Sequence, residues 1–171
     1  TSTSFPNSMV DRIVPSTEDR HIEMVAERLG VVDLAPVPAE MFSMWVLEDN
    51  FIAGRPAWEK AGVIFSNEVD AYETMKLRLL NGSHSLIAYV GALLHKVTVP
   101  DARYTPLIEE AVQKFMTEEM LPTFTMPSTI EFTAYVTDLF SRWSNTVLND
   151  KIARIGSDGS IKLPPRITQT T

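Results

Sequence analysis

One polar face of a predicted helix carries the residues best suited to chemistry. Lys76, Asn81 and His84 lie within the string MKLRLLNGSHS, and Glu73 precedes them by one turn. At about 100° of rotation per residue, all four side chains fall within an arc of about 140° on one side of an α-helix. The surrounding residues are largely Leu, Ile, Met and Ala, so these polar groups need hydrogen-bond partners. A polar ligand could be that partner.

Together these groups could act on a carbinol or carbonyl oxygen. A neutral lysine amine can take a proton from a substrate hydroxyl, which makes Lys76 the candidate general base. Asn81 can donate a hydrogen bond to the oxygen as it becomes negative, and neutral His84 can donate from one ring nitrogen and accept at the other. Glu73 is a possible proton relay between Lys76 and solvent, although the sequence leaves its protonation state open.

Gly82 lies on the opposite side of the same helix. Glycine inside a helix costs about 1 kcal/mol relative to alanine. We therefore expect another part of the backbone to approach closely at this position.

Two helices have clear sequence signals. The segment 69–94 contains no Pro and is rich in Leu, Met and Ala, which predicts one long central helix capped at Asp70. A second helix is predicted over 17–29, between an N-cap at Ser16 and a stop at Gly30.

Two further helices follow in the C-terminal half. The run 102–124 predicts an amphipathic helix that ends at Pro122. Another is predicted near 128–139, with a possible continuation to Ile155 after a break around 144–145.

Three segments lack these signals. The two prolines of 31–40 predict an extended connector, and 41–62 favours neither helix nor strand. The segment 156–171 combines a turn, GSDGS, with a Pro-rich polar stretch that predicts no regular element. No alternation is strong enough to predict a sheet. The sequence therefore predicts a mainly α, multi-helical fold, with residues 1–171 forming one domain.

Composition excludes several classes of function. The 171 residues carry a formal charge of -7, which repels phosphate backbones and anionic lipids and argues against nucleic acid or a membrane as partner. With no Cys there is no disulfide, thiolate zinc site, iron–sulfur cluster or Cys nucleophile. The longest purely apolar run, 86–94, is far shorter than the roughly 18 to 20 residues of a membrane-spanning helix. We expect a cytoplasmic protein.

The spacing Lys76-x4-Asn81-x2-His84 resembles the active-site signature of the mannitol dehydrogenase family, the polyol-specific long-chain dehydrogenases. Three further blocks resemble mannitol 2-dehydrogenases and fructuronate reductases: FPNSMVDRIVP, WVLEDNFIAGRPAWEKAGVIF and IARIGSDGSIKLPPRI. The resemblance runs in order from Phe5 to Ile167. It implies a helical fold like that of the C-terminal domain of 6-phosphogluconate dehydrogenases.

The resemblance also implies roles for individual residues. It makes Lys76 the general base and Asn81 a donor to the reacting oxygen. His84 and Asp11 would bind substrate hydroxyls. A final pair, Arg154 and Lys162, would contact the far end of a polyol or sugar acid. The implied reaction is metal-independent hydride transfer between C2 of this small-molecule substrate and NAD or NADP.

One departure from the family is large. Its nucleotide-binding Rossmann domain, with a glycine-rich turn after the first strand, precedes the FPNSMVDRIVP block and is missing from this sequence. We therefore expect a fragment that holds the catalytic half, needs the missing domain as a partner, and turns over poorly by itself. The choice between NAD and NADP, the identity of the substrate and the oligomeric state stay open.

Simpler interpretations exist for each of these residues. Lys76 could be a solvated lysine and His84 a core histidine, while Asp11 could form a local salt bridge with Arg12. Zinc bound by Asp11, Glu73 and His84 has no support from Cys or paired His spacing. The alternative function is a noncatalytic helical module for ligand binding or assembly. The joint spacing of Lys76, Asn81 and His84 favours the enzyme.

Overall fold

The computed structural model describes residues 3–168. A continuous central helix runs through α2 (Val69–Met75), a π-helical turn η2 (Lys76–Gly82) and α3 (Ser83–Leu93). The predicted long helix over 69–94 is therefore confirmed, with two differences. Glu68, and not Asp70, occupies the N-cap position, and the middle of the helix has the wider π geometry.

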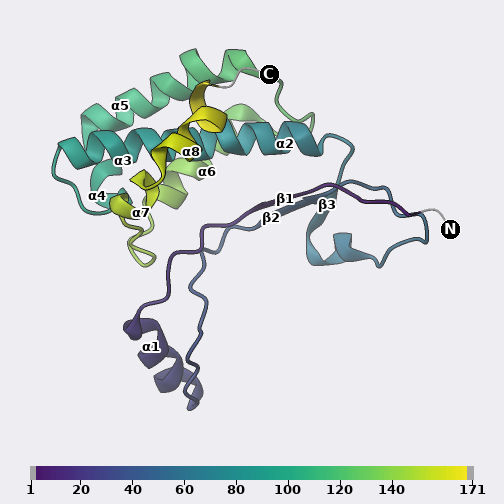
Figure 1. Cartoon of the computed structure of the whole chain (residues 1–171), viewed down its shortest axis with the longest axis horizontal. Coiled ribbons are helices and arrows are strands. Elements are labelled where there is room, and N and C mark those ends of the chain that lie inside the picture. The colour runs from purple at the N-terminus through teal and green to yellow at the C-terminus, as the bar shows by residue number, and fades with distance from the viewer. Residues whose placement is uncertain (1–2, 169–171) are drawn as a thin grey trace.

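Other helices pack around this central one (Figure 1). The run predicted as one amphipathic helix over 102–124 is divided into α4 (Val99–Arg103), α5 (Pro106–Lys114), η3 (Phe115–Met120) and η4 (Leu121–Thr123). The division falls before Pro106, which is well suited to a first helical position because it has no backbone N–H to satisfy. None of the helices within residues 3–168 is both long and apolar enough to cross a membrane.

The helix predicted near 128–139 is present as α6 (Phe132–Trp143). It begins later than predicted, because the Glu131 side chain accepts hydrogen bonds from the backbone N–H groups of Thr133 and Ala134. It ends at Ser144, where the break was predicted.

The turn predicted at GSDGS is present at residues 157–158, between α7 (Ile152–Gly156) and α8 (Gly159–Leu163). Of the possible helical continuation to Ile155, only α7 forms. The prediction that no regular element follows the turn is wrong for the described residues, because α8 and the π-helical turn η5 (Pro164–Thr168) lie there. Each has only five residues, too few to show a helical period in sequence. Residues 169–171 of the predicted stretch lie outside the described residues.

Gly82 allows this C-terminal segment to approach the central helix. A Cβ atom at Gly82 would lie 3.2 Å from the carbonyl oxygen of Arg166 and 3.2 Å from the ring of Phe115. The close backbone approach predicted at this glycine is therefore confirmed.

A small sheet lies beside the helical body (Figure 1), and the prediction that no sheet forms is wrong. Its order is β1-β2-β3: β1 (Ser8–Asp11) pairs antiparallel with β2 (Met44–Leu47), and β2 pairs parallel with β3 (Val63–Phe65). Strands of three or four residues are too short for alternation to be recognised. The β1–β2 pairing also joins residues far apart in sequence, such as Ser8 and Leu47.

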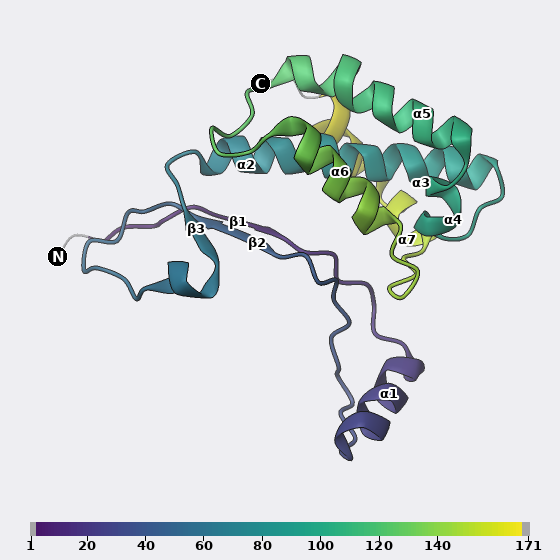
Figure 2. The same ribbon diagram turned by 180° about the vertical axis from the view of Figure 1, so that it is seen from behind.

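The helix predicted over 17–29 is confirmed as α1 (Asp19–Leu29), which ends at Gly30 with a left-handed φ of 69°. Its N-cap is Glu18, which forms a capping box with His21, rather than Ser16. No residue of α1 is buried, and Figure 2 shows it at the tip of an arm that projects from the molecule. The predicted connector 31–40 contains no helix or strand and leads back from α1 to β2.

One hydrophobic core joins the sheet to the helices. Met9 and Val46 of the sheet belong to the same buried cluster as Tyr72, Leu79 and other residues of the central helix. Gly91 of α3 makes room for two neighbours, since a Cβ there would lie 2.7 Å from Ile152 Cδ1 and 3.0 Å from Ala102 Cβ.

This packing predicts that Gly91→Val lowers the free energy of unfolding by about 1 to 3 kcal/mol, the usual cost of overfilling a core. Urea unfolding of the chain measures the change. Ala92→Val is the matched control, because Ala92 is exposed on the same helix. Equal stabilities of the two variants would contradict the packing role of Gly91.

Candidate active site

A cavity of about 260 Å³ is lined by every residue predicted to bind substrate or to catalyse, except the proposed proton relay Glu73. Its walls come from the end of β1 and the chain after it, from the central helix, and from the C-terminal segment α7–η5. The predicted site residues that line it are Asp11, Lys76, Asn81, His84, Arg154 and Lys162.

The π-helical turn aligns the residues of the central helix. Backbone bonds in a π-helix join residue i to i+5, so each turn holds more residues and each residue rotates the chain by less than in an α-helix. Asn81, which follows Lys76 by five residues, therefore lies closer to the face of Lys76 than a regular α-helix allows. Lys76, Leu80, Asn81 and His84 all line the cavity.

His84 is buried, with 6% of its surface exposed, and lies 5.6 Å from Trp143 between ring centres. Burial lowers the pKa of His84 to about 3, helped by the positive charges of Arg142 and Arg154. The imidazole is therefore neutral at physiological pH. Its Nε2 atom has no hydrogen-bond partner among the described residues.

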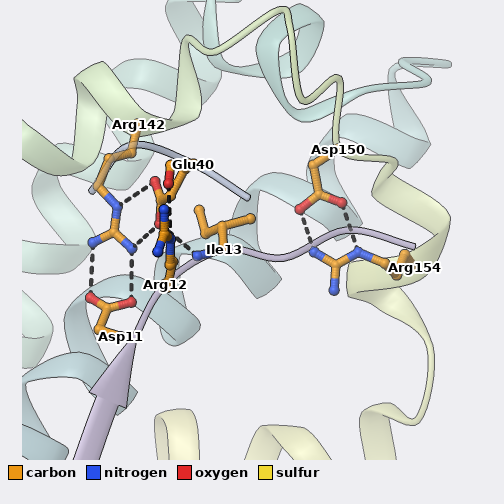
Figure 3. A network of polar contacts seen from close by, with 7 residues as sticks. All are labelled: Asp11, Arg12, Ile13, Glu40, Arg142, Asp150 and Arg154. Atoms are coloured by element: carbon orange, nitrogen blue, oxygen red, sulfur yellow. Dashed lines mark hydrogen bonds and ion pairs between the residues drawn. The ribbon is translucent and has the colours of Figure 1, made fainter. Parts of the chain in front are cut away.

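Asp11 is held in a buried ion cluster that Figure 3 shows. Its two carboxylate oxygens accept hydrogen bonds of 2.9 and 2.8 Å from Nη1 and Nη2 of Arg142 on α6. Arg142 also donates to both oxygens of Glu40, from Nε at 3.0 Å and from Nη2 at 2.8 Å. Arg12, the alternative partner of Asp11 in the sequence, donates instead to the backbone carbonyl of Glu40.

This cluster fixes one wall of the cavity. Glu40 Oε1 accepts a hydrogen bond of 2.6 Å from the backbone N–H of Ile13, two residues beyond Asp11. Burial opposes the charge of Arg142, but the hydrogen bonds to Asp11 and Glu40 outweigh it and raise the pKa of Arg142. The chain after β1 is thus tied to α6 through a permanently charged guanidinium.

Sequence analysis missed Arg142 and Glu40, although one signal was present. Tyr135, Leu139 and Arg142 follow the i, i+4, i+7 spacing of one helix face, and the first two are buried. An arginine in line with an apolar stripe predicts a buried charge that needs a carboxylate partner.

Arg154 and Lys162 lie on either side of the turn between α7 and α8. Arg154 forms two hydrogen bonds with the carboxylate of Asp150 (Figure 3). The Lys162 amine lies 3.1 Å from Ser157 Oγ, to which it donates, and 3.6 Å from a carboxylate oxygen of Asp158. Both cations therefore have acidic neighbours within the chain.

Two residues depart from the predicted set. Glu73 is exposed on α2 and does not line the cavity, so its role as a proton relay stays a prediction. Arg166 of η5 lines the cavity but was not singled out, because its Pro-rich segment was predicted to be irregular.

The described residues do not form a dinucleotide phosphate site. Such sites use a glycine-rich turn between a strand and a helix. Among residues 3–168, β3 leads to α2 through Ser66, Asn67 and Glu68, without glycine, and the GSDGS turn joins two helices. Nor do three or more His, Asp or Glu side chains of this range lie close enough to hold a metal ion.

Two family models match the chain. One described as the mannitol dehydrogenase C-terminal domain matches residues 68–170, and one described as the mannitol dehydrogenase Rossmann domain matches residues 1–60. The models therefore meet between η1 (Trp58–Ala61) and α2. The expectation that the Rossmann domain is missing altogether is wrong, because residues 1–60 match its model. The prediction of one domain over 1–171 stays a prediction.

Named relatives agree with these matches. The chain is 43% identical over 164 residues to D-mannonate oxidoreductase of Escherichia coli, covering 96% of this chain and 34% of that protein. It is 44% identical over 161 residues to mannitol 2-dehydrogenase of Cereibacter sphaeroides, covering 94% of this chain and 34% of that one. The chain thus spans about a third of the length of the curated relatives it matches.

A solved structure is also similar. The ternary complex of Pseudomonas fluorescens mannitol 2-dehydrogenase with NAD and D-mannitol matches with a TM-score of 0.85 at 42% sequence identity. The match covers 94% of this chain and 33% of that one.

The ion cluster predicts a large effect of Arg142→Met. The change leaves Asp11 and Glu40 buried without their counter-ion, so the free energy of unfolding should fall by about 3 to 5 kcal/mol. Urea unfolding measures it. Arg20→Met is the control, since it removes an ion pair whose side chains are 46% and 40% exposed, and it should change stability far less. Similar losses in the two variants would show that the cluster is not strongly stabilising.

The neutral state of His84 predicts a dependence of stability on pH. Below about pH 6.5 the unfolded chain binds a proton at His84, whereas the folded chain stays unprotonated there down to about pH 3. The free energy of unfolding should therefore fall as the pH falls through this interval, by up to about 1.4 kcal/mol per pH unit from this group.

Unfolding at several values between pH 5 and 6.5 tests this linkage against His84→Gln, which has no titrating ring. The variant should show a shallower slope than the wild type. Parallel slopes would mean that His84 titrates normally in the folded chain.

Proposed function

Because the chain belongs to the mannitol dehydrogenase family, we propose that it forms the substrate-binding and catalytic half of an NAD(P)-dependent oxidoreductase. The reaction interconverts a polyol or sugar acid with its 2-keto form, as in mannitol and fructose or mannonate and fructuronate. One observation carries this proposal. The base candidate and the polar residues of three distant segments line the same cavity.

In this proposal Lys76 takes the proton from the C2 hydroxyl. Its side chain is partly buried on the cavity wall, one π turn before Asn81. Asn81 has an amide N–H that can donate to the oxygen as it gains negative charge. A donor aimed at a developing charge stabilises the transition state more than the ground state.

His84 holds the same oxygen or the neighbouring hydroxyl. A buried nitrogen without a partner costs about 1 to 3 kcal/mol, so the unpaired Nε2 atom favours a ligand group that completes its hydrogen bond. The neutral ring can either donate or accept at that atom. This freedom suits a site that handles a hydroxyl in one direction and a carbonyl in the other.

Asp11 contributes to substrate binding through lone pairs that Arg142 leaves free. A carboxylate has about four acceptor positions, and the two bonds from Arg142 use two of them. The remaining positions can accept from substrate hydroxyls, with the carboxylate already fixed in orientation. Arg154 and Lys162 contact the far end of the substrate.

The nicotinamide cofactor, when bound, accepts or supplies the hydride at C2. Residues 1–60 match the family's Rossmann-domain model, but the described residues lack a dinucleotide phosphate site, so we propose that the cofactor is bound mainly outside residues 3–168. The chain by itself then has little turnover, and the reaction needs no metal. The proposal also includes a cytoplasmic location and a helical body like the C-terminal domain of 6-phosphogluconate dehydrogenases.

This function predicts that Lys76→Ala lowers kcat by at least about 100-fold, the usual contribution of a general base. The assay follows NADH oxidation with D-fructose and D-fructuronate, in a protein that joins this chain to the family's nucleotide-binding domain. Lys60→Ala is the matched control, because Lys60 is exposed on η1. A Lys76→Ala rate near that of the wild type from pH 6 to 10 would refute the base assignment. If the wild-type protein reduces neither ketose with NADH or with NADPH, the result would favour the noncatalytic module.

A further inference from the structure

Arg166 is a charged cavity residue to which no role has yet been given. The π-helical turn that carries it packs against Gly82, where a Cβ atom would make a tight contact of 3.2 Å with the Arg166 carbonyl oxygen. Its Nη1 atom donates a hydrogen bond of 3.0 Å to Ser85 Oγ on α3. Both the backbone and the side chain of Arg166 are therefore held at the cavity by contacts with the central helix.

The charge of Arg166 is not compensated within the described chain. Its contact with Ser85 uses one of five N–H donors, and no Asp or Glu of residues 3–168 forms an ion pair with it. Burial lowers the pKa of Arg166, which means that its charged form is poorly solvated. An arginine in this position lacks the carboxylate that a partly buried guanidinium normally has.

The other charged residues of the cavity differ in this respect. Arg154 is paired with Asp150, and Lys162 lies near Asp158. Asp11 is the one acid among the described lining residues, and Arg142 already neutralises it. Three lining cations of the described chain form no ion pair with an acid: Arg12, Lys76 and Arg166. Arg12 is exposed to solvent and Lys76 is the proposed base, so Arg166 is the partly buried cation that is left for a ligand.

We propose that Arg166 binds the terminal carboxylate of a six-carbon sugar acid, and that this contact makes the site prefer a 2-keto sugar acid to the neutral 2-ketose. The proposal rests on the proposed function and specifies its substrate class. A guanidinium can donate two parallel hydrogen bonds to a carboxylate, whereas a hydroxymethyl group offers one weaker acceptor and no charge. Arg166 thus serves as a specificity-determining residue rather than as part of the proton transfer.

The test compares kcat/KM for D-fructuronate and D-fructose in the protein joined to its nucleotide-binding domain. Wild type should prefer D-fructuronate. Arg166→Gln should lower kcat/KM for D-fructuronate about 10- to 100-fold more than for D-fructose, mainly through KM, because a charge-assisted contact is lost. Arg166→Lys should recover part of the preference, since it restores the charge without the paired donors. Arg28→Gln, an exposed arginine on α1, is the matched control.

Equal losses for the two ketoses in Arg166→Gln, or a wild-type preference for D-fructose, would overturn the proposal while leaving the dehydrogenase function intact. A calorimetric titration distinguishes failure of the Arg166 proposal from failure of the proposed dehydrogenase function. Wild-type chain should bind D-mannonate more tightly than D-mannitol, and this difference should shrink in Arg166→Gln. Absence of turnover with both ketoses would contradict the proposed function, whereas equal binding of the acid and the polyol would contradict the role of Arg166. If Arg166→Gln does not fold, the proposal is tested by the substrate preference of the wild type and by whether Arg166→Lys reduces that preference.

Discussion

The site depends on one buried cluster of charges, in which Arg142 binds Asp11 and Glu40. These two carboxylates lie 131 and 102 residues from Arg142 in sequence, so the cluster joins the N-terminal ribbon to the helical body. Unpaired carboxylates are expensive to bury, and each is therefore constrained to the place where the guanidinium can reach it. Four of the five Arg142 donors are used in these contacts. The position of Asp11 at the cavity follows from this constraint.

The cluster also explains how a cavity with so many cations is tolerated. Two carboxylates against one guanidinium leave one formal negative charge in excess beside the cavity. The cavity lining includes five lysines and arginines, and this negative charge beside them is fixed in place by hydrogen bonds. The two family models meet between residues 60 and 68, yet the cluster and the shared core of Met9, Val46 and Tyr72 cross that boundary. Residues on both sides of it are needed to build the cavity.

Sequence alone predicted the long, periodic elements and the main site residues. The segment 69–94 was recognisable because many residues repeat one preference, and the spacing of Lys76, Asn81 and His84 placed them on one face. The π turn was not predictable, since no residue type marks it, and it improved the alignment of Asn81 with Lys76. The strands were not predicted, because their pairing is set by tertiary contacts such as Ser8 with Leu47. Glu40 and Arg166 were not identified as site residues, because each belongs to a Pro-containing segment whose path depends on what it packs against.

Satisfied and unsatisfied polar groups divide the cavity into two parts. Asp11 and Arg154 have strong partners within the protein, so a ligand can add contacts to them but is not required to complete them. His84 Nε2 has no partner, and Arg166 has a single neutral one. A buried polar atom without a partner raises the free energy of the empty site, so a ligand that supplies the partner gains more there than at an already paired charge. Specificity at this site should therefore depend on the unsatisfied groups, whereas the paired charges set the shape that the ligand must fit.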